Sequence, residues 1–193
     1  LRCLPSQCPL GQACGLLHGA PSCLELPGRC SLAPPTGAVS FDGAQGPAMA
    51  PGVYVIAALC DACAGPWFRL LADVGEALRG LHLFSAGAFI TITSDRKLWV
   101  NGIPSTIPTE VPGGLNITEV HGSIRISQSS LEIGFIPGRE VAVTAAPELG
   151  GKLCGICGNY DGNAANDLQG PDGTLVGSME AMAKAWRAPD FTH

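Results

Sequence analysis

Charge is scarce in this 193-residue sequence, and the charged residues do not gather in runs. Only 14% of the residues are charged, with 11 Lys and Arg against 16 Asp and Glu, which gives a formal net charge of -5. A nucleic-acid-binding surface needs a basic patch or stripe. The composition therefore excludes the usual electrostatic footprint of nucleic-acid-binding proteins.

Long apolar runs are missing as well. No run reaches the ~18 residues that a membrane-spanning helix requires, so we expect no membrane insertion. The longest run, residues 53–60, has the length of a buried strand. No charged and apolar leader stands before Leu1. We expect a segment of a longer chain, with any signal peptide removed or lying far upstream.

Catalytic constellations are also lacking. The four histidines are dispersed and lie beside no Ser/Asp or Cys/Asn grouping of the kind that nucleophilic catalysis needs. No glycine-rich phosphate loop stands between a strand and a helix. The sequence predicts that the protein is not an enzyme.

Cysteine, in contrast, is abundant, with nine residues. A short, nearly uncharged stretch cannot build a core, so disulfides are the natural way to hold the first thirty residues. Zinc is the rival, because Cys60/Cys63 and Cys154/Cys157 are C-x-x-C pairs, but no histidine is near either pair. Disulfides are favoured, which predicts a secreted, extracellular protein. The N-terminal cysteines are Cys3, Cys8, Cys14, Cys23 and Cys30.

From residue 39 onwards the chain is a series of short β-patterned runs separated by Gly, Pro or Ser. Their spacing of roughly ten residues is typical of an antiparallel sandwich or barrel. Asn101-Gly102 predicts a type I′ hairpin turn. We predict an all-β antiparallel β-sandwich with a small, loop-rich, disulfide-rich N-terminal segment. The expected strands are 53–60, 67–73, 81–84, 88–93, 97–100, 116–120, 123–127, 131–136 and 140–144.

One short C-terminal helix is expected after residue 177. Ser178 is a suitable N-cap, and Met179, Met182, Ala183 and Trp186 share one face. Core packing against the sheets is the interpretation we favour for this Met/Trp face.

Several motifs in fixed order resemble the von Willebrand factor type D (VWD) domain. They are Phe41-Asp42-Gly43, the strand ending in Cys60, Val100-Asn101-Gly102, the run 153–167, Pro171-Asp172-Gly173 and Trp186. The run 153–167, which begins Leu-Cys-Gly-Ile-Cys-Gly-Asn-Tyr-Asp, is the most specific. Residues 1–29 resemble the cysteine-rich, E-like (TIL-like) segment that precedes such domains in the IgG Fc-binding protein, zonadhesin and alpha-tectorin group. The resemblance implies a VWD domain over residues 30–193.

Two departures from the family pattern are visible. The stretch 34–37 reads Pro-Pro-Thr-Gly in place of Gly-Asp-Pro-His, so the Asp-Pro self-cleavage of some relatives is not expected here. Gly52 and Val53 stand where a cysteine often pairs with a following C8 module, and His193 ends the sequence before any such module.

Oxygen-bearing side chains crowd the loop that follows Cys157. Oxygen donors at close spacing suit Ca²⁺, although the loop is not an EF-hand, and a solvated Asx/Gly-rich turn is the alternative. The resemblance implies that the loop binds calcium and that Asp42 closes the site. The implied ligand set is Asp42, Asn159, Asp161, Asn163, Asn166 and Asp167.

The resemblance also implies the disulfide pairs Cys30–Cys157 and Cys60–Cys154. Cys3, Cys8, Cys14 and Cys23 would then form two local bridges whose connectivity the sequence leaves open. Cys63 is left over. It would either pair outside this segment, which would give an oligomer, or compete with Cys60 for Cys154.

Asn116-Ile117-Thr118 is an N-glycosylation sequon, with an unmodified strand-edge asparagine as the alternative. Together these features predict a non-catalytic, calcium-stabilised module of a larger secreted mucin-like or adhesive glycoprotein. Its partners would be other domains of the same chain or other secreted glycoproteins. The alternatives are thiol–disulfide exchange at Cys154/Cys157 during assembly, and a receptor module for immunoglobulin or an egg-coat protein.

Overall fold

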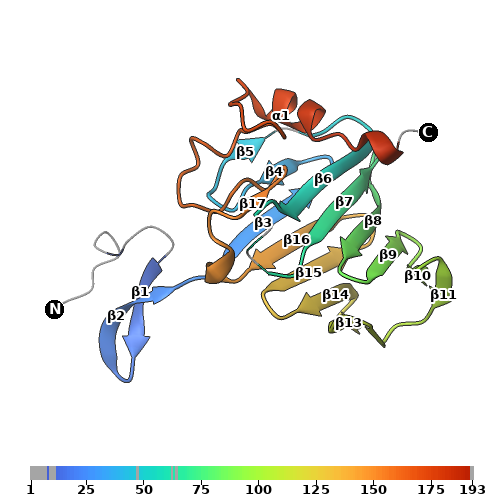
Figure 1. Ribbon diagram of the computed structural model, residues 1–193, viewed down its shortest axis with the longest axis horizontal. Helices are drawn as coiled ribbons and strands as arrows, with labels where there is room; N and C mark the ends of the chain where they lie inside the picture. Colours follow the sequence, from blue (N-terminus) through green and yellow to red (C-terminus); the bar gives the residue numbers. More distant parts are fainter. Residues whose placement is uncertain (1–7, 9–11, 47, 62, 64, 192–193) are drawn as a thin grey trace.

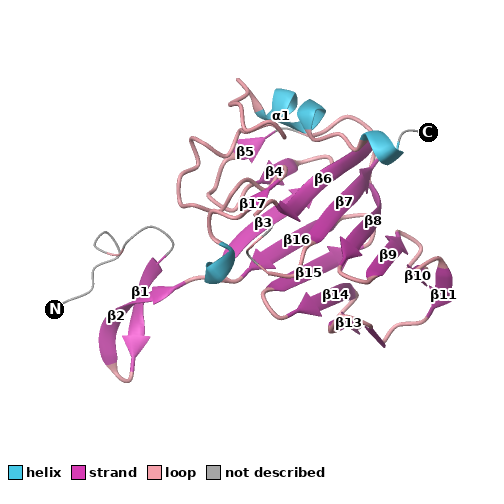
Figure 2. Cartoon of the chain, viewed as in Figure 1, coloured by secondary structure: helices cyan, strands magenta, loops and turns pink. Residues whose placement is uncertain are grey.

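Two antiparallel sheets face each other in the computed structural model, which describes residues 8, 12–46, 48–61, 63 and 65–191. A separate two-stranded hairpin projects from one end of the sandwich. A short helix lies beside the edge strand β5 (Gln45–Gly46) (Figure 1). Strands and loops make up nearly all of the described chain (Figure 2). The predicted β-sandwich with its short C-terminal helix is confirmed.

The first sheet has seven strands and is a meander over most of its width. Its order is β11-β10-β9-β8-β7-β6-β17. Asn101 and Gly102, at φ of 52° and 77°, connect β10 to β11, which agrees with the predicted hairpin. The strands are β6 (Gly52–Leu59), β7 (Phe68–Val74), β8 (Leu78–Ser85), β9 (Ala88–Thr93), β10 (Leu98–Val100), β11 (Ile103–Ser105) and β17 (Leu153–Cys154).

The second sheet has eight strands in the order β12-β13-β14-β15-β16-β3-β4-β5. The late strand β16 pairs antiparallel with the early strand β3, which closes the domain on itself. The strands are β3 (Gly28–Ala33), β4 (Gly37–Val39), β5 (Gln45–Gly46), β12 (Thr109–Val111), β13 (Leu115–Val120), β14 (Ser123–Gln128), β15 (Leu131–Ile136) and β16 (Glu140–Ala145).

Alternating side chains from the two sheets form the core. In β9 and β15, for example, every second residue is buried, as a strand with one face toward a core requires. Phe135, Leu70 and Ile117 are each fully buried in this cluster, together with the bridged Cys30 and Cys157. β6 differs, because seven of its eight residues are buried. The continuous apolar run of the sequence is therefore a strand covered on both faces.

The N-terminal region contains more β-structure than the sequence predicted. β1 (Gln12–Leu17) and β2 (Ala20–Glu25) form a hairpin in a stretch predicted to be loop-rich, and β3 begins before residue 39. The prediction failed there because the hairpin buries too little surface to show alternation. Its exposed Leu16 and Leu17 give no inward-facing pattern.

The C-terminal segment covers one edge and one face of the seven-stranded sheet. Helix α1 (Met179–Ala185) begins after Ser178, whose Oγ accepts a hydrogen bond from the backbone N–H of Ala181. Met179, Met182 and Ala183 are buried in the core, as predicted for this face. A 3-10 turn follows at Pro189–Phe191, and another precedes β17 at Pro147–Leu149. None of the helices in the described chain is long and apolar enough to cross a membrane.

Candidate metal site and its disulfides

The candidate site is the loop of residues 158–167, which follows β17 and lies at the end of the sandwich near β4 and β5. Three of the side chains predicted to bind a metal contact one another there. The Nδ2 atoms of Asn159 and Asn166 both donate to Oδ2 of Asp161, at 3.1 and 2.6 Å. Asn159 Nδ2 also lies 3.5 Å from Asn166 Oδ1. The loop thus gathers two asparagine side chains around one carboxylate.

Asp42 reaches this loop from the opposite sheet. It lies in the turn between β4 and β5, and its carboxylate accepts backbone hydrogen bonds from Asp161 (3.0 Å to Oδ2) and Gly162 (2.9 Å to Oδ1). More than a hundred residues separate Asp42 from these partners. The geometry therefore joins the Phe-Asp-Gly element to the loop.

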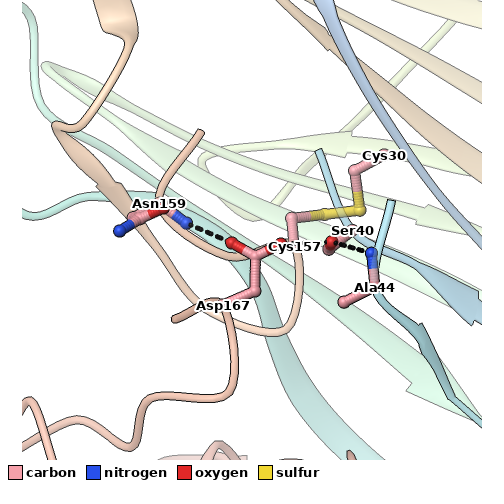
Figure 3. Close-up of a disulfide and its surroundings, with 6 residues drawn as sticks. All are labelled: Cys30, Ser40, Ala44, Cys157, Asn159 and Asp167. Atoms are coloured by element: carbon pink, nitrogen blue, oxygen red, sulfur yellow. Dashed lines mark hydrogen bonds between the residues drawn. A yellow bond between two sulfur atoms is a disulfide. The ribbon is translucent and has the colours of Figure 1, made fainter. Parts of the chain in front are cut away.

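Asp167 is the buried member of the set, with 1% of its surface exposed. The Ser40 hydroxyl donates to Oδ2 of Asp167, and the backbone N–H of Asn159 donates to Oδ1 at 3.3 Å. Ser40 Oγ also accepts from the backbone N–H of Ala44 at 2.8 Å. Figure 3 shows Asp167 beside the Cys30–Cys157 bridge, between Asn159 and Ser40. Ser40 was missed from the sequence, where a serine ahead of Phe41 carries no distinguishing signal.

Asn163 contacts the other predicted ligands through its backbone, since its N–H donates to Oδ1 of Asp161 at 2.9 Å and its carbonyl oxygen accepts from the N–H of Asn166 at 3.1 Å. Its Oδ1 accepts a hydrogen bond from the backbone N–H of Ala165 at 3.1 Å, which is an Asx turn. Gly158 gives the loop its close approach to Asp167. Its φ is +80°, and a Cβ there would lie 2.1 Å from Asp167 Oδ1. A side chain at position 158 is therefore excluded both by backbone conformation and by space.

The electrostatics of the pair formed by Asp42 and Asp167 are unfavourable for two anions. Burial raises the pKa of Asp167 to about 6, the Ser40 hydroxyl lowers it, and the nearby Asp42 carboxylate raises it again. None of the ion pairs among the described residues involves either carboxylate. The two carboxyl groups therefore lie close together without a neutralising cationic side chain from the described residues.

The chemistry available at this site is that of hard oxygen donors. In the part of the chain that the structure describes, no three His, Cys, Asp or Glu side chains are grouped so that they could hold a metal by themselves. A cation here would need asparagine oxygens in addition to carboxylates, and an Asn side chain presents its oxygen once the amide is turned. Asn159 and Asn166, whose amide nitrogens now face Asp161, are the residues that would have to turn.

The raised pKa of Asp167 predicts a specific pH dependence of the stability of the protein in the absence of divalent metal ions. Because the folded-state pKa is about 6 and the ordinary value is 3.8, the folded protein holds this proton more tightly than the unfolded chain. The stability contributed by Asp167 is then fully present below about pH 4 and is lost as the pH rises through about 6. In excess chelator, the free energy of unfolding of Asp167→Asn relative to that of the wild type should increase as the pH is raised from 4.5 to 7.5. Denaturant unfolding at the two pH values measures this difference. If the difference in free energy of unfolding between the two proteins were the same at both pH values, the raised pKa of Asp167 would be contradicted.

The disulfides join the loop to both sheets. Cys30 of β3 is bonded to Cys157, and Cys60, at the end of β6, is bonded to Cys154 of β17. These are the two pairs that the resemblance implied. Cys30 and Cys157 are 1% and 0% exposed, so this bridge belongs to the core between the sheets. The Cys60–Cys154 bridge lies at the surface, because Cys60 is exposed and Cys154 half-buried.

Of the N-terminal cysteines, Cys8 and Cys23 form a bridge with a Cα–Cα distance of 5.5 Å. Cys14 is also disulfide-bonded, and Cys3 lies outside the described residues. Cys63 is exposed and is the free cysteine of the described chain. Since Cys154 and Cys157 are each bonded elsewhere, the C-x-x-C pair does not form a dithiol of the redox-enzyme type.

Tyr160, inside the loop, connects the site to the N-terminal hairpin. Its hydroxyl donates to the backbone oxygen of Leu26 at 2.8 Å, and its ring contacts Phe41 with centroids 5.5 Å apart. The ring also lies over Gly28, where a Cβ would come within 2.6 Å of it. The conformation of the loop is thereby linked to the point where the hairpin joins the sandwich.

The sequence is similar to known proteins along its whole length. The family model of the von Willebrand factor type D domain matches residues 30–174. The IgGFc-binding protein of Homo sapiens is 32% identical over 202 residues, zonadhesin of Homo sapiens 27% over 197, and alpha-tectorin of Gallus gallus 26% over 195. These alignments cover 100%, 97% and 97% of this chain but only 4%, 7% and 9% of the relatives. The chain therefore belongs to the von Willebrand factor type D domain family.

Proposed function

We propose that this chain is a non-catalytic extracellular module that binds Ca²⁺ at the loop 158–167 and thereby stiffens one end of a β-sandwich. The observation that carries the proposal is the contact between Asp42 and the loop. The Asp42 carboxylate accepts hydrogen bonds from the backbone N–H groups of both Asp161 and Gly162. A cation bound there would neutralise Asp42 and Asp167 and link the β4–β5 turn to the loop.

The donor set supports Ca²⁺ over other metals. Ca²⁺ takes six to eight oxygens in a flexible geometry, whereas Zn²⁺ prefers nitrogen and sulfur. Every side chain of the set is a carboxylate or an amide, and the neighbouring cysteines are already bonded in pairs. Asp42, Asp161 and Asp167 would supply the charge, with Asn159 and Asn166 supplying neutral oxygens. Asn163, which caps its own turn, would be the most peripheral ligand.

The disulfides support an extracellular location. Bridges of this kind persist in oxidising compartments and are rare in the cytosol. The chain covers a small part of each relative, so its role is that of one unit in a larger glycoprotein, mucin-like or adhesive in character. Its partners would be neighbouring domains or other secreted glycoproteins, met through surfaces that the rigid sandwich presents. Cys63, exposed and free, would be available for a bridge to a second chain.

Calcium titration of the purified domain by calorimetry tests the proposal. Asp161→Ala should weaken binding about tenfold or more, equal to at least about 1.4 kcal/mol, because Asp161 is the carboxylate at the centre of the loop. The matched control is Asp172→Ala. Asp172 also closes an Asx turn, with Thr174, but lies outside the predicted ligand set. Absence of a calcium-binding signal in the wild-type protein would overturn the proposal.

A further inference from the structure

A polar groove crosses the outer face of the eight-stranded sheet and contains the sequon asparagine in its wall. It has a volume of about 440 Å³ and is lined by Asn116 with Ser127, Glu132 and Thr144, among others. The groove is shallow and largely open to solvent. None of the residues that line the groove belongs to the loop 158–167 or to the predicted ligand set.

Strand register explains why these side chains line one groove. Asn116 of β13 is the cross-strand partner of Ser127, Ser127 of Glu132, and Glu132 of Thr144. Directly paired residues on adjacent strands point to the same face of a sheet. The four residues therefore form one row across β13, β14, β15 and β16, with Asn116 at one end.

The sequon is accessible on the outer face of the sheet. Asn116 and Thr118 are both exposed, while Ile117 between them is fully buried. Because side chains alternate along a strand, Asn116 and Thr118 point to the same, outer face. An N-linked sugar on Asn116 would thus begin at the end of the groove.

We propose that Asn116 carries an N-linked glycan whose first sugars lie in this groove along the row Ser127–Glu132–Thr144. The hydroxyl and carboxylate groups of the row match the hydroxyl and amide groups of an N-acetylhexosamine. Ala146 and Pro27, which also line the groove, offer apolar contacts for acetyl methyl groups and sugar faces. The docked glycan would cover β13 and β14 beside the short edge strand β12 and shield that edge from pairing with other chains.

The modification uses a lipid-pyrophosphate-linked oligosaccharide as donor. The amide nitrogen of Asn116 forms a bond to the anomeric carbon of the first sugar and loses one proton to a base of the transferase. The bond from that carbon to the lipid pyrophosphate breaks, and the pyrophosphate leaves with the electron pair. The inference rests on the secretory location proposed above, but not on calcium binding.

Expression of the chain in a secretory mammalian cell tests the proposal in two steps. Peptide mass spectrometry should find a glycan on Asn116 that is absent from Thr118→Ala. Peptide N-glycosidase should then release the glycan from the native protein about tenfold more slowly than from the denatured protein, which corresponds to a docking free energy of about 1.4 kcal/mol.

The control moves the sequon by one row on the same face. Thr118→Ala/Arg125→Asn creates a sequon at 125–127, and position 125 pairs with Thr118 and Gly134 outside the groove. Release from this control should be fast in the native state.

Thr144→Tyr, which fills the groove, should accelerate release of the glycan from Asn116 without changing the fraction of Asn116 that is glycosylated. A secreted, folded protein with an unmodified Asn116 would overturn the site, and equal native release rates from positions 116 and 125 would overturn the docking. Neither result would bear on calcium binding, which the titration measures separately.

Discussion

Removal of calcium is expected to lower the midpoint of thermal unfolding of this domain by about 5–10 °C. A ligand that binds only the folded protein stabilises it by about 2.7 kcal/mol at a hundred times its dissociation constant. For a chain of this length, each kcal/mol shifts the midpoint by about 2–4 °C. The loss should be this large because Asp42 and Asp167 are left close together without a counter-charge. Scanning calorimetry in Ca²⁺ and in excess chelator measures it.

Two variants make the calcium experiment specific to the loop. Asp161→Ala in the presence of Ca²⁺ should unfold close to the midpoint of the chelated wild type, and chelator should have little further effect on it. Asp172→Ala should keep the full response, since among the described residues the Asp172 side chain bonds to Thr174, within its own turn. A wild-type midpoint that stays constant after verified calcium removal would refute a stabilising role for the ion.

Loss of the buried disulfide is expected to have a still larger effect. Cys30→Ala/Cys157→Ala opens a closure of 127 residues, for which the chain-entropy model gives about 5 kcal/mol. Because both sulfurs are buried between the sheets, the variant also loses core packing. Domains are commonly stable by only about 5–15 kcal/mol, so the double variant should fail to fold or should unfold at a much lower denaturant concentration.

The surface bridge provides the matched comparison. Cys60→Ala/Cys154→Ala opens a closure of 94 residues, worth about 4.7 kcal/mol in the same model, but removes no buried sulfur pair. Both double variants should carry Cys63→Ser, so that the free thiol does not exchange with the remaining bridges. We expect the Cys60/Cys154 variant to be secreted and folded at reduced stability, measured by urea unfolding. Equal denaturation midpoints for the two double variants would mean that burial of the bridge contributes nothing.

Apart from β12, which was not predicted, the strands from β6 to β16 were predictable because each carries a local signal. Alternation in β9 and β15, the continuous apolar run of β6 and Asn101-Gly102 all arise within a few residues of sequence. The hairpin β1–β2 gave no such signal, because it is too small to bury one face against a core. Strands β3 and β4 were missed as well, although β3 alternates between buried and less buried residues. Their recognition would have required knowing that β16 lies beside them.

The candidate site was only partly visible in the sequence. Asn159, Asp161 and Asn166 fall within one short loop, and the structure brings them into hydrogen-bonding contact. The contributions of Asp42 and of the disulfide partners came from resemblance to a family and not from any physical pattern. Ser40, whose hydroxyl holds Asp167, was not predicted at all. Its contact spans 127 residues, and no local rule couples positions so far apart.

The sequence by itself determined the β class, the turns, the abundance of cysteine and a loop rich in oxygen donors, because composition and local periodicity encode these properties directly. The tertiary structure alone decided that Asp167 is buried against Ser40, that Asp42 caps the loop from the other sheet, and that one bridge is internal while the other is exposed. It also decided that Asn116 stands at the end of a polar groove. Each of these features depends on which strands become neighbours, and that pairing is set by the packing of the two sheets.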